Sequence, residues 1–358
     1  MIYYTYFFCL FFFFSKMYNT SEVQKKFFLL FSLTSLFLIF GSRYYIGGDY
    51  YGYMNLYNKM AIHGFHYGYK QVEFLYFTIL ILCTKLGLGY FSVNFLLMFI
   101  FLFFYNDYIN KFKNPFFVLL ISLPIIFVPI SINFVRQAIA ISIFLFSIQY
   151  LVSGRYIKYL FYILLATMFH KFAILYSLFY FVYLKNFNKI IKHLLFVIFF
   201  ISTFLFFSFI FEIKFITTIL VDKFYWSLQV YTSEMYKDLS PKGGYFRLGM
   251  IFLSFFILTY FRDFFKKYDE YKLWYSAGLL MIFLTPAFFI YPFLMSRIII
   301  FVFPIVIFVF GNVIHCNRYK KILNINIISL FFVIYFFIWL NFSPFKRFFT
   351  PYESIFFL

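Results

Sequence analysis

The fold is decided by residues 115–152, which read PFFVLLISLPIIFVPISINFVRQAIAISIFLFSIQYLV. Arg136 is the only charged residue in this apolar stretch. A membrane-spanning helix needs roughly 20 mostly apolar residues. The stretch therefore predicts two spans, residues 115–131 and 137–152, that meet close to Arg136.

The composition of the whole chain agrees with a membrane protein. Of its 358 residues, 65% are apolar and only 12% are charged, whereas soluble domains carry about 25% charged residues. So few charges cannot cover a surface that faces water. Cys9, Cys83 and Cys316 are too scattered to form a disulfide framework. The apolar runs are also far longer than the alternating strands, about ten residues each, of a transmembrane β-barrel.

We therefore expect an all-α fold, namely a polytopic transmembrane helical bundle with about 12 to 13 membrane segments. The bundle should form a single integral membrane domain over residues 1–358. Two connections are long, residues 42–72 and 212–247, and we place both on the outer side. Segment 73–86 is short, so we expect a re-entrant or broken helix there. The segments are expected at 2–14, 27–41, 73–86, 90–105, 115–131, 137–152, 157–170, 172–184, 194–211, 246–261, 273–291, 298–314 and 322–341.

The orientation follows from the distribution of Lys and Arg. The connections assigned to the cytoplasm hold 17 of these residues among 54, whereas the outer connections hold 13 among 98. This asymmetry has the direction that the positive-inside rule predicts. It also explains the net charge of +19 without a nucleic-acid partner. The cytoplasmic connections are 15–26, 106–114, 153–158, 185–193, 262–272 and 315–321.

The informative charges are those inside the spans or directly against them, because a charge at the bilayer centre costs on the order of 3 kcal/mol or more. In this topology all of these residues lie at the outer ends of spans or just beyond. The positive-inside rule explains charges at inner ends but not at outer ends. We therefore expect a polar site at the outer face. Its candidate members are Arg43, Asp49, Glu73, Arg136, His170 and Arg297.

Arg136 and His170 offer the clearest chemistry. The guanidinium of Arg136 presents a rigid fork of donors that suits phosphate or carboxylate, and the amide of Gln137 beside it also needs a partner. His170 interrupts an apolar stretch, and a neutral imidazole there would accept a proton from a hydroxyl. Alternatively, Arg136 and Arg297 each extend the charged head group to the membrane interface. The alternative for His170 is a purely structural role.

The segment around Asp49 is a second candidate region. Gly47 and Gly48 permit a tight turn, which would bring Asp49 back towards Arg43 to form a pair. The tyrosines that follow, including Tyr50 and Tyr53, offer flat faces and hydroxyls for sugar rings. Membrane interfaces also collect tyrosine, so the aromatic residues alone carry little weight.

The sequence lacks the motifs that are typical of several enzyme classes. It contains no Walker A, dinucleotide, HExxH or CxxC pattern and no G-x-S-x-G elbow. His63 and His66 lack an acidic or cysteine partner nearby. We therefore expect no cofactor, no metal site and no ATP hydrolysis within this chain.

These motifs together resemble the EpsG family, which comprises polytopic bacterial proteins of exopolysaccharide assembly related to Wzy-type O-antigen polymerases. The resemblance covers roughly residues 43–301. Two positions depart from the family pattern, because Phe172 replaces a small hydroxyl residue and Phe301 replaces a tyrosine. The matching features are Arg43 with Ile46-Gly47-Gly48-Asp49-Tyr50 and Tyr53, Arg136-Gln137 with Ile139-Ala140, His170 at a span break, and Arg297 entering a late span.

The resemblance implies a multi-pass protein of the bacterial cytoplasmic (inner) membrane. It would join oligosaccharide repeat units carried on polyprenyl pyrophosphate at the outer face, as a metal-independent membrane glycosyltransferase, to build capsule, exopolysaccharide or O-antigen. Other implied partners are membrane lipid, a chain-length regulator and a flippase. The implied catalytic residues are Arg136, His170, Arg297 and Asp49, and the implied substrate-binding residues are Arg43, Gln137, Tyr50, Tyr53 and Glu73.

Three other functions use similar residues. A flippase for the same lipid-linked oligosaccharide also needs intramembrane Arg, but it should carry buried charge in the inner half as well. An O-antigen ligase shares the chemistry and differs in its acceptor. A membrane O-acyltransferase that uses His170 would need access to its acyl donor from the cytoplasm.

Overall fold

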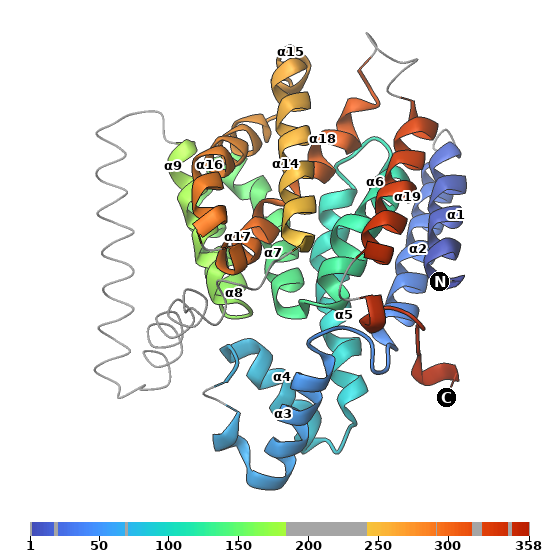
Figure 1. Ribbon diagram of the computed structural model, residues 1–358, viewed down its shortest axis with the longest axis vertical. Helices are drawn as coiled ribbons and strands as arrows, with labels where there is room; N and C mark the ends of the chain where they lie inside the picture. The colour runs from blue at the N-terminus through green and yellow to red at the C-terminus, as the bar shows by residue number, and fades with distance from the viewer. Residues whose placement is uncertain are drawn as a thin grey trace.

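The computed structural model of the chain describes residues 2–17, 21–68, 71–183, 242–290, 292–316, 324–342 and 346–357. Within these ranges all regular elements are helical, and one isolated β-bridge joins Arg43 to Ser354. The helices form a bundle with a smaller lobe at one end, built from α3 (Tyr50–His63) and α4 (Phe74–Lys85), as Figure 1 shows. The predicted all-α polytopic bundle is confirmed.

Six of the described helical stretches are long and apolar enough to cross a membrane. Shorter apolar helices also occur, whereas the segment expected at 194–211 and most of the 212–247 loop lie outside the described residues. The six stretches are α2 (Glu22–Gly41), α5 (Tyr90–Ile109), α6 (Pro115–Ser122) with η2 (Leu123–Ile132), α7 (Val135–Val152), α17 (Pro292–Val302) with α18 (Ile305–Val313), and α19 (Ile325–Phe342). The shorter helices include α1 (Ile2–Lys16), α8 (Tyr156–Thr167), η3 (Lys171–Leu178) with α9 (Phe179–Val182), and α14 (Lys242–Tyr260).

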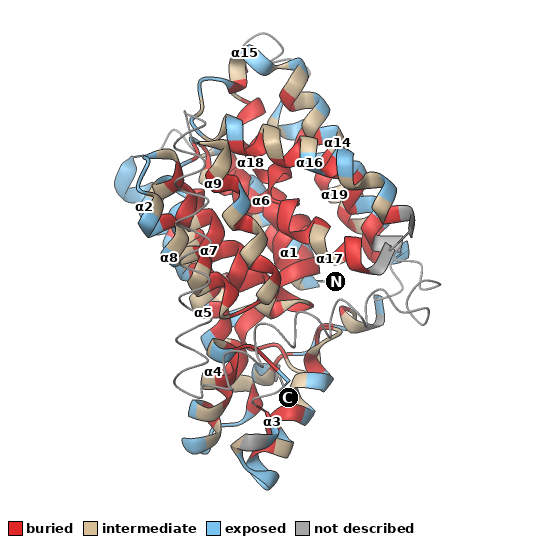
Figure 2. Ribbon diagram, turned by 90° about the vertical axis from the view of Figure 1, so that its left-hand side faces the viewer, coloured by how far each residue is buried: buried red, intermediate tan, exposed pale blue. Residues whose placement is uncertain are grey.

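The stretch of α6 and η2 is the core of the bundle. Of this stretch 94% is buried inside the protein, against 22% of α2, and buried residues concentrate along the central helices in Figure 2. The second half, η2, is a π-helix that contains Pro124 and Pro129. A proline has no backbone N–H and collides with the carbonyl four residues earlier, so the wider π turn accommodates both rings.

The length of α4 decides whether segment 73–86, expected to be re-entrant or broken, spans the membrane. This helix has 12 residues, which at 1.5 Å per residue reach about 18 Å, too short for a hydrocarbon core of about 30 Å. It packs against α3 in the small lobe, beyond the end of the bundle (Figure 1). Glu73, which precedes α4, therefore lies where the lobe meets the bundle.

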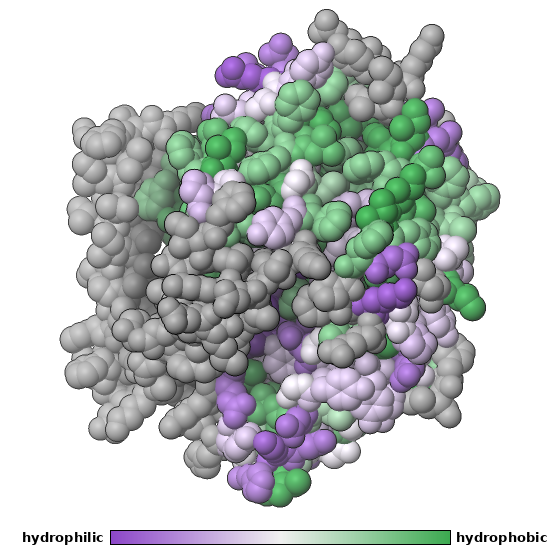
Figure 3. Space-filling view, viewed as in Figure 1, coloured by the Kyte–Doolittle hydropathy of each residue, from purple (hydrophilic) through white to green (hydrophobic). Residues whose placement is uncertain are grey.

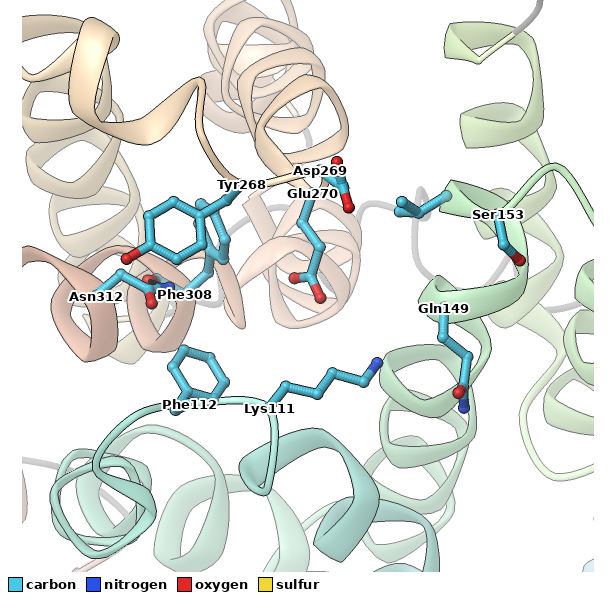
Figure 4. Close-up of a pocket in the computed structure, with 10 residues that line it drawn as sticks. Lys111, Phe112, Gln149, Ser153, Tyr268, Asp269, Glu270, Phe308 and Asn312 are labelled. Atoms are coloured by element: carbon cyan, nitrogen blue, oxygen red, sulfur yellow. Dashed lines mark hydrogen bonds between the residues drawn. The ribbon is translucent and has the colours of Figure 1, made fainter. Parts of the chain in front are cut away.

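Polar side chains lie at both ends of the bundle (Figure 3). On the face that Figure 3 shows, apolar side chains cover the bundle, and polar side chains gather on the small lobe and at the opposite end. At that opposite end Lys111, Ser153 and Glu270, from three of the predicted cytoplasmic connections, line one cavity of about 430 Å³. Figure 4 shows Lys111 and Glu270 extending into it from facing elements.

The C-terminal residues hold the loop that precedes α3. The backbone N–H of Tyr44 donates to Glu353 O at 3.1 Å, and that of Gly47 donates to Phe348 O at 2.9 Å. The end of the chain therefore fixes the backbone directly ahead of Asp49.

Candidate functional site

Arg136 is the centre of the site, and it is anchored by groups from the small lobe. It is the second residue of α7 and forms an ion pair with Glu73, while its Nε donates to the Tyr53 hydroxyl at 2.7 Å. Its guanidinium carbon lies 5.0 Å from the ring centroid of Tyr53 and 5.7 Å from that of Tyr76. Glu73 is only 3% exposed. Because Glu73 is enclosed and Arg136 is only partly exposed, this pair fixes the small lobe on the bundle.

The tight turn predicted at Gly47 and Gly48 also helps to position the residues around Arg136. Gly47 has φ +106°, a region that favours glycine, and a Cβ there would collide with the carbonyl oxygen of Ile132. The N–H of Gly48 donates to the side-chain oxygen of Asn133 at 2.5 Å. The loop before Asp49 is therefore joined to the turn between η2 and α7, three residues ahead of Arg136.

We expect Gly47→Ala to displace this loop and to reduce activity by about tenfold or more, since an ångström-scale misplacement of a site costs up to two orders of magnitude. Gly52→Ala is the matched control. Gly52 lies inside α3 with nothing within 4 Å of its would-be Cβ, so alanine there should stabilise the helix by about 0.5–1 kcal/mol. The measurement is the activity and the thermal unfolding of both variants. Equal activity in the two would contradict this role of Gly47.

His170 lies in the short break between α8 and η3, and it is buried beside the Arg136–Glu73 pair. Its ring is 5.4 Å from that of Phe301, and its charge state is coupled to Glu73, Arg136 and Arg297. Burial lowers the pKa of His170 to about 3, although Glu73 opposes this shift. Nδ1 has no hydrogen-bond partner among the described residues. His170 is therefore a neutral imidazole whose Nδ1 is buried without a hydrogen-bond partner in the described part of the chain.

The carboxylate of Glu73 also orders the chain next to His170. The backbone N–H of Lys171 donates to Glu73 Oε1 at 3.5 Å. Burial raises the pKa of Glu73, but Arg136 outweighs this effect, so the pKa lies below its ordinary value. One ionised carboxylate thus holds both Arg136 and the chain at the His170 break.

Asp49 and Arg297 complete the cluster. Burial raises the pKa of Asp49, while the nearby charges of Arg297 and Arg136 and the neighbouring Tyr53 hydroxyl lower it. The guanidinium carbon of Arg297, on α17, lies 4.4 Å from the ring centroid of Phe134. Asp49 therefore sits within reach of two cations that come from different helices.

The predicted pair between Arg43 and Asp49 is not formed. Arg43 is 2% exposed and donates to Asn94 at 2.8 Å and to the carbonyl of Phe40 at 3.1 Å. It is fully enclosed where the C-terminal residues meet the loop, because Ser354 bridges to its backbone. The physical reason is that Asn94, on α5, and the carbonyl of Phe40 already occupy the donors of Arg43.

Two further predicted binding residues lie outside the Arg136 cluster. Tyr50 packs edge-on against Tyr90, with ring centroids 5.1 Å apart. Gln137 is 2% exposed, and neither atom of its amide has a partner in the described part of the chain. It follows Arg136 on α7 and so points to a different side of the helix.

The sequence interpretation missed Arg247, which it counted in the outer loop 212–247. In the structure Arg247 lies on α14, is 8% exposed and has its guanidinium carbon 5.9 Å from the ring centroid of Phe134. A signal was present, because Arg247 precedes a long apolar run in the same way as Arg297.

Comparisons with known proteins identify one family. The model of the EpsG family matches residues 26–354 of the 358. No curated protein and no solved structure matches the chain.

Proposed function

Since this chain belongs to the EpsG family, we propose that it is a polysaccharide polymerase that joins polyprenyl-pyrophosphate-linked oligosaccharide repeat units at the outer face of the bacterial cytoplasmic membrane. The family supports a polymerase-type role in exopolysaccharide biosynthesis. The specific donor and leaving group are proposals that rest on the family resemblance, and the outer face is a proposal that rests on the distribution of charge along the sequence.

The observation that carries the proposal is that Asp49, Glu73, Arg136, His170 and Arg297 converge at one end of the bundle. They come from separate parts of the chain, and their charges interact with one another. A structural ion pair would need only two of them. A cluster of cations with a buried neutral base suits a reaction that transfers a proton and releases an anion.

The proposed reaction is a single displacement. The acceptor hydroxyl attacks the anomeric carbon of the donor sugar, and the bond from that carbon to the diphosphate oxygen breaks. The electron pair leaves with the lipid diphosphate, and the hydroxyl proton passes to Nδ1 of His170. Negative charge grows on the leaving oxygen, where a preorganised guanidinium stabilises it far better than water does. Arg297 supplies this cation, so the proposal requires no metal ion.

Asp49 and Tyr53 are proposed to orient the sugars. The Tyr53 hydroxyl accepts from Nε of Arg136 and also lowers the pKa of Asp49, so a sugar hydroxyl bound to Asp49 would lie close to the cluster. Glu73 and Arg136 act as positioning residues for His170. A chain-length regulator and a flippase are the further partners that this role would need.

The transport alternative is less well supported by the packing below the site. The ring of Phe301 lies 5.4 Å from that of Tyr176, and the rings of Tyr176 and Phe144 stack at 3.5 Å. Trp274 continues this series 6.2 Å from Phe144 and donates to Glu270 in the opposite cavity. A continuous series of packed aromatic rings therefore extends from His170 towards the cavity that Glu270 lines.

The test of this function is the lipid-linked glycan that accumulates after the gene is deleted. We expect single repeat units on polyprenyl pyrophosphate in the outer leaflet, together with loss of polymer. Material trapped in the inner leaflet would indicate a flippase instead. Full-length polymer that is made but not attached to its final acceptor would indicate a ligase. Re-expression of the wild-type chain should restore polymer.

A further inference from the structure

A groove runs between α1 and α19, and Leu120 of α6 contributes to its floor. Its volume is about 290 Å³, and apolar side chains cover the face around α19 in Figure 3. From Asn326 to Phe337 the groove extends along about 16 Å of α19, at 1.5 Å per residue. The hydrocarbon core of a bilayer is about 30 Å thick, so the groove has the length of one leaflet and of a single acyl chain.

One end of the groove carries a cation. Lys16, the last residue of α1, donates to the side-chain oxygen of Asn326, which lines the groove. Lys16 is exposed, and no carboxylate in the described ranges forms an ion pair with it. The C-terminal end of α1 lies away from the small lobe (Figure 1), which is the cytoplasmic side in the orientation predicted from charge. Anionic lipids of the cytoplasmic leaflet attract lysines at such a position.

Ser329 lies deeper in the groove, about 4.5 Å beyond Asn326 along the helix. Its side chain is 3% exposed, and Oγ has no hydrogen-bond partner among the residues that the structure describes. The hydroxyls of Ser32 and Ser254, on other apolar helices, donate to the carbonyl four residues earlier. Buried polar atoms are seldom left without a partner. Because Ser329 lines the groove, an acceptor on a bound molecule would satisfy it.

The cation, the buried hydroxyl and the apolar walls match the parts of one lipid. We propose that the groove binds an anionic glycerophospholipid of the cytoplasmic leaflet, with its phosphate on Lys16, an ester carbonyl on Ser329 and one acyl chain along α19. The ester carbonyls of such a lipid lie directly beneath its phosphate, as Ser329 lies beneath Asn326. The acyl chain then passes Val333 and Leu120. A polyprenyl phosphate has no ester carbonyl and would leave Ser329 without a partner.

The experiment measures lipid binding to the delipidated full-length protein by native mass spectrometry. The probes are phosphatidylglycerol, phosphatidylcholine and the ether-linked analogue of phosphatidylglycerol, all with the same chain length. The wild type should bind phosphatidylglycerol most tightly, because phosphatidylcholine has no net charge and the ether analogue has no carbonyl. Lys16→Gln should weaken phosphatidylglycerol binding about fivefold, to the level of phosphatidylcholine, whereas Lys16→Arg should retain the preference. Ser329→Ala should remove the preference for the ester over the ether.

Matched variants separate the groove from the rest of the surface. Lys26→Gln and Ser35→Ala change an exposed lysine and a carbonyl-bonded serine on α2, so both should bind as the wild type does. Val333→Trp should fill the groove and abolish the preference for phosphatidylglycerol. Ile334→Trp, at the next position of α19 but outside the groove lining, should leave it unchanged. Phosphatidylglycerol should also raise the unfolding temperature of the wild type and of Ile334→Trp, but not of Val333→Trp.

Three results would overturn the proposal. The first is equal binding of the three probes by the wild type. The second is a Lys16→Gln variant that keeps the head-group preference, or a Ser329→Ala variant that keeps the ester preference. The third is a dimeric wild type that Val333→Trp converts to a monomer, because the groove would then hold a second copy of the chain. None of these results bears on the proposed function, since the groove is separate from the Arg136 cluster.

Discussion

Replacing Arg136 by alanine should abolish polymer formation and destabilise the protein by about 3–5 kcal/mol, the usual cost of removing one partner of a buried ion pair. Glu73 would remain buried, at 3% exposure, without the cation that compensates its charge. The lobe of α3 and α4 would also lose its main anchor on α7. Polymer production in cells that lack the native gene and unfolding of the purified variant measure the two effects.

The double variant Arg136→Gln with Glu73→Gln tests whether the uncompensated charge of Glu73 causes this loss of stability. Removing both charges leaves neither unbalanced, so stability should recover in part while polymer synthesis stays absent. The exposed pair of Glu22 and Lys25, at 2.9 Å, is the matched control, since breaking a surface pair changes stability by about 1 kcal/mol or less. Polymer of normal length from Arg136→Ala would remove Arg136 from the mechanism.

His170→Asn should slow polymer synthesis by about 10²- to 10⁴-fold, the usual contribution of a positioned base. Asparagine keeps a polar group near Glu73 but cannot accept the proton. The measurement is the rate of repeat-unit joining in membranes supplied with lipid-linked donor. His315→Asn is the control, because His315 is a half-buried histidine at the opposite end, after α18. A rate equal to the wild type would show that His170 is structural.

The pH dependence of the wild type gives an independent check on the same residue. Burial lowers the pKa of His170 to about 3, so its basic, neutral form is present throughout the range from about pH 5 to pH 8. Activity should therefore show no midpoint near the ordinary histidine pKa of about 6.5. A midpoint there that disappears in His170→Asn would contradict the burial of this group.

The sequence predicted most members of the site but not how they pair. Arg136, His170, Arg297, Asp49 and Glu73 stood out because charge at outer span ends has no topological explanation, and the structure brings all five together. The same rule concealed Arg247, because its position at the end of the long 212–247 connection made it count as a loop cation. It also treated Arg43 as a member of the site, whereas Arg43 holds the loop and the C-terminal residues in place.

The sequence by itself determined that the chain forms a helical bundle in a membrane, because the length and apolarity of each segment act locally and need no knowledge of neighbours. Only the tertiary structure decided which side chains pair with one another. Arg136 meets Glu73 and Tyr53 across separations of 63 and 83 residues, and Arg43 takes Asn94 in place of Asp49. Such pairs depend on how helices pack in three dimensions, and local patterns carry no information about distances of that kind.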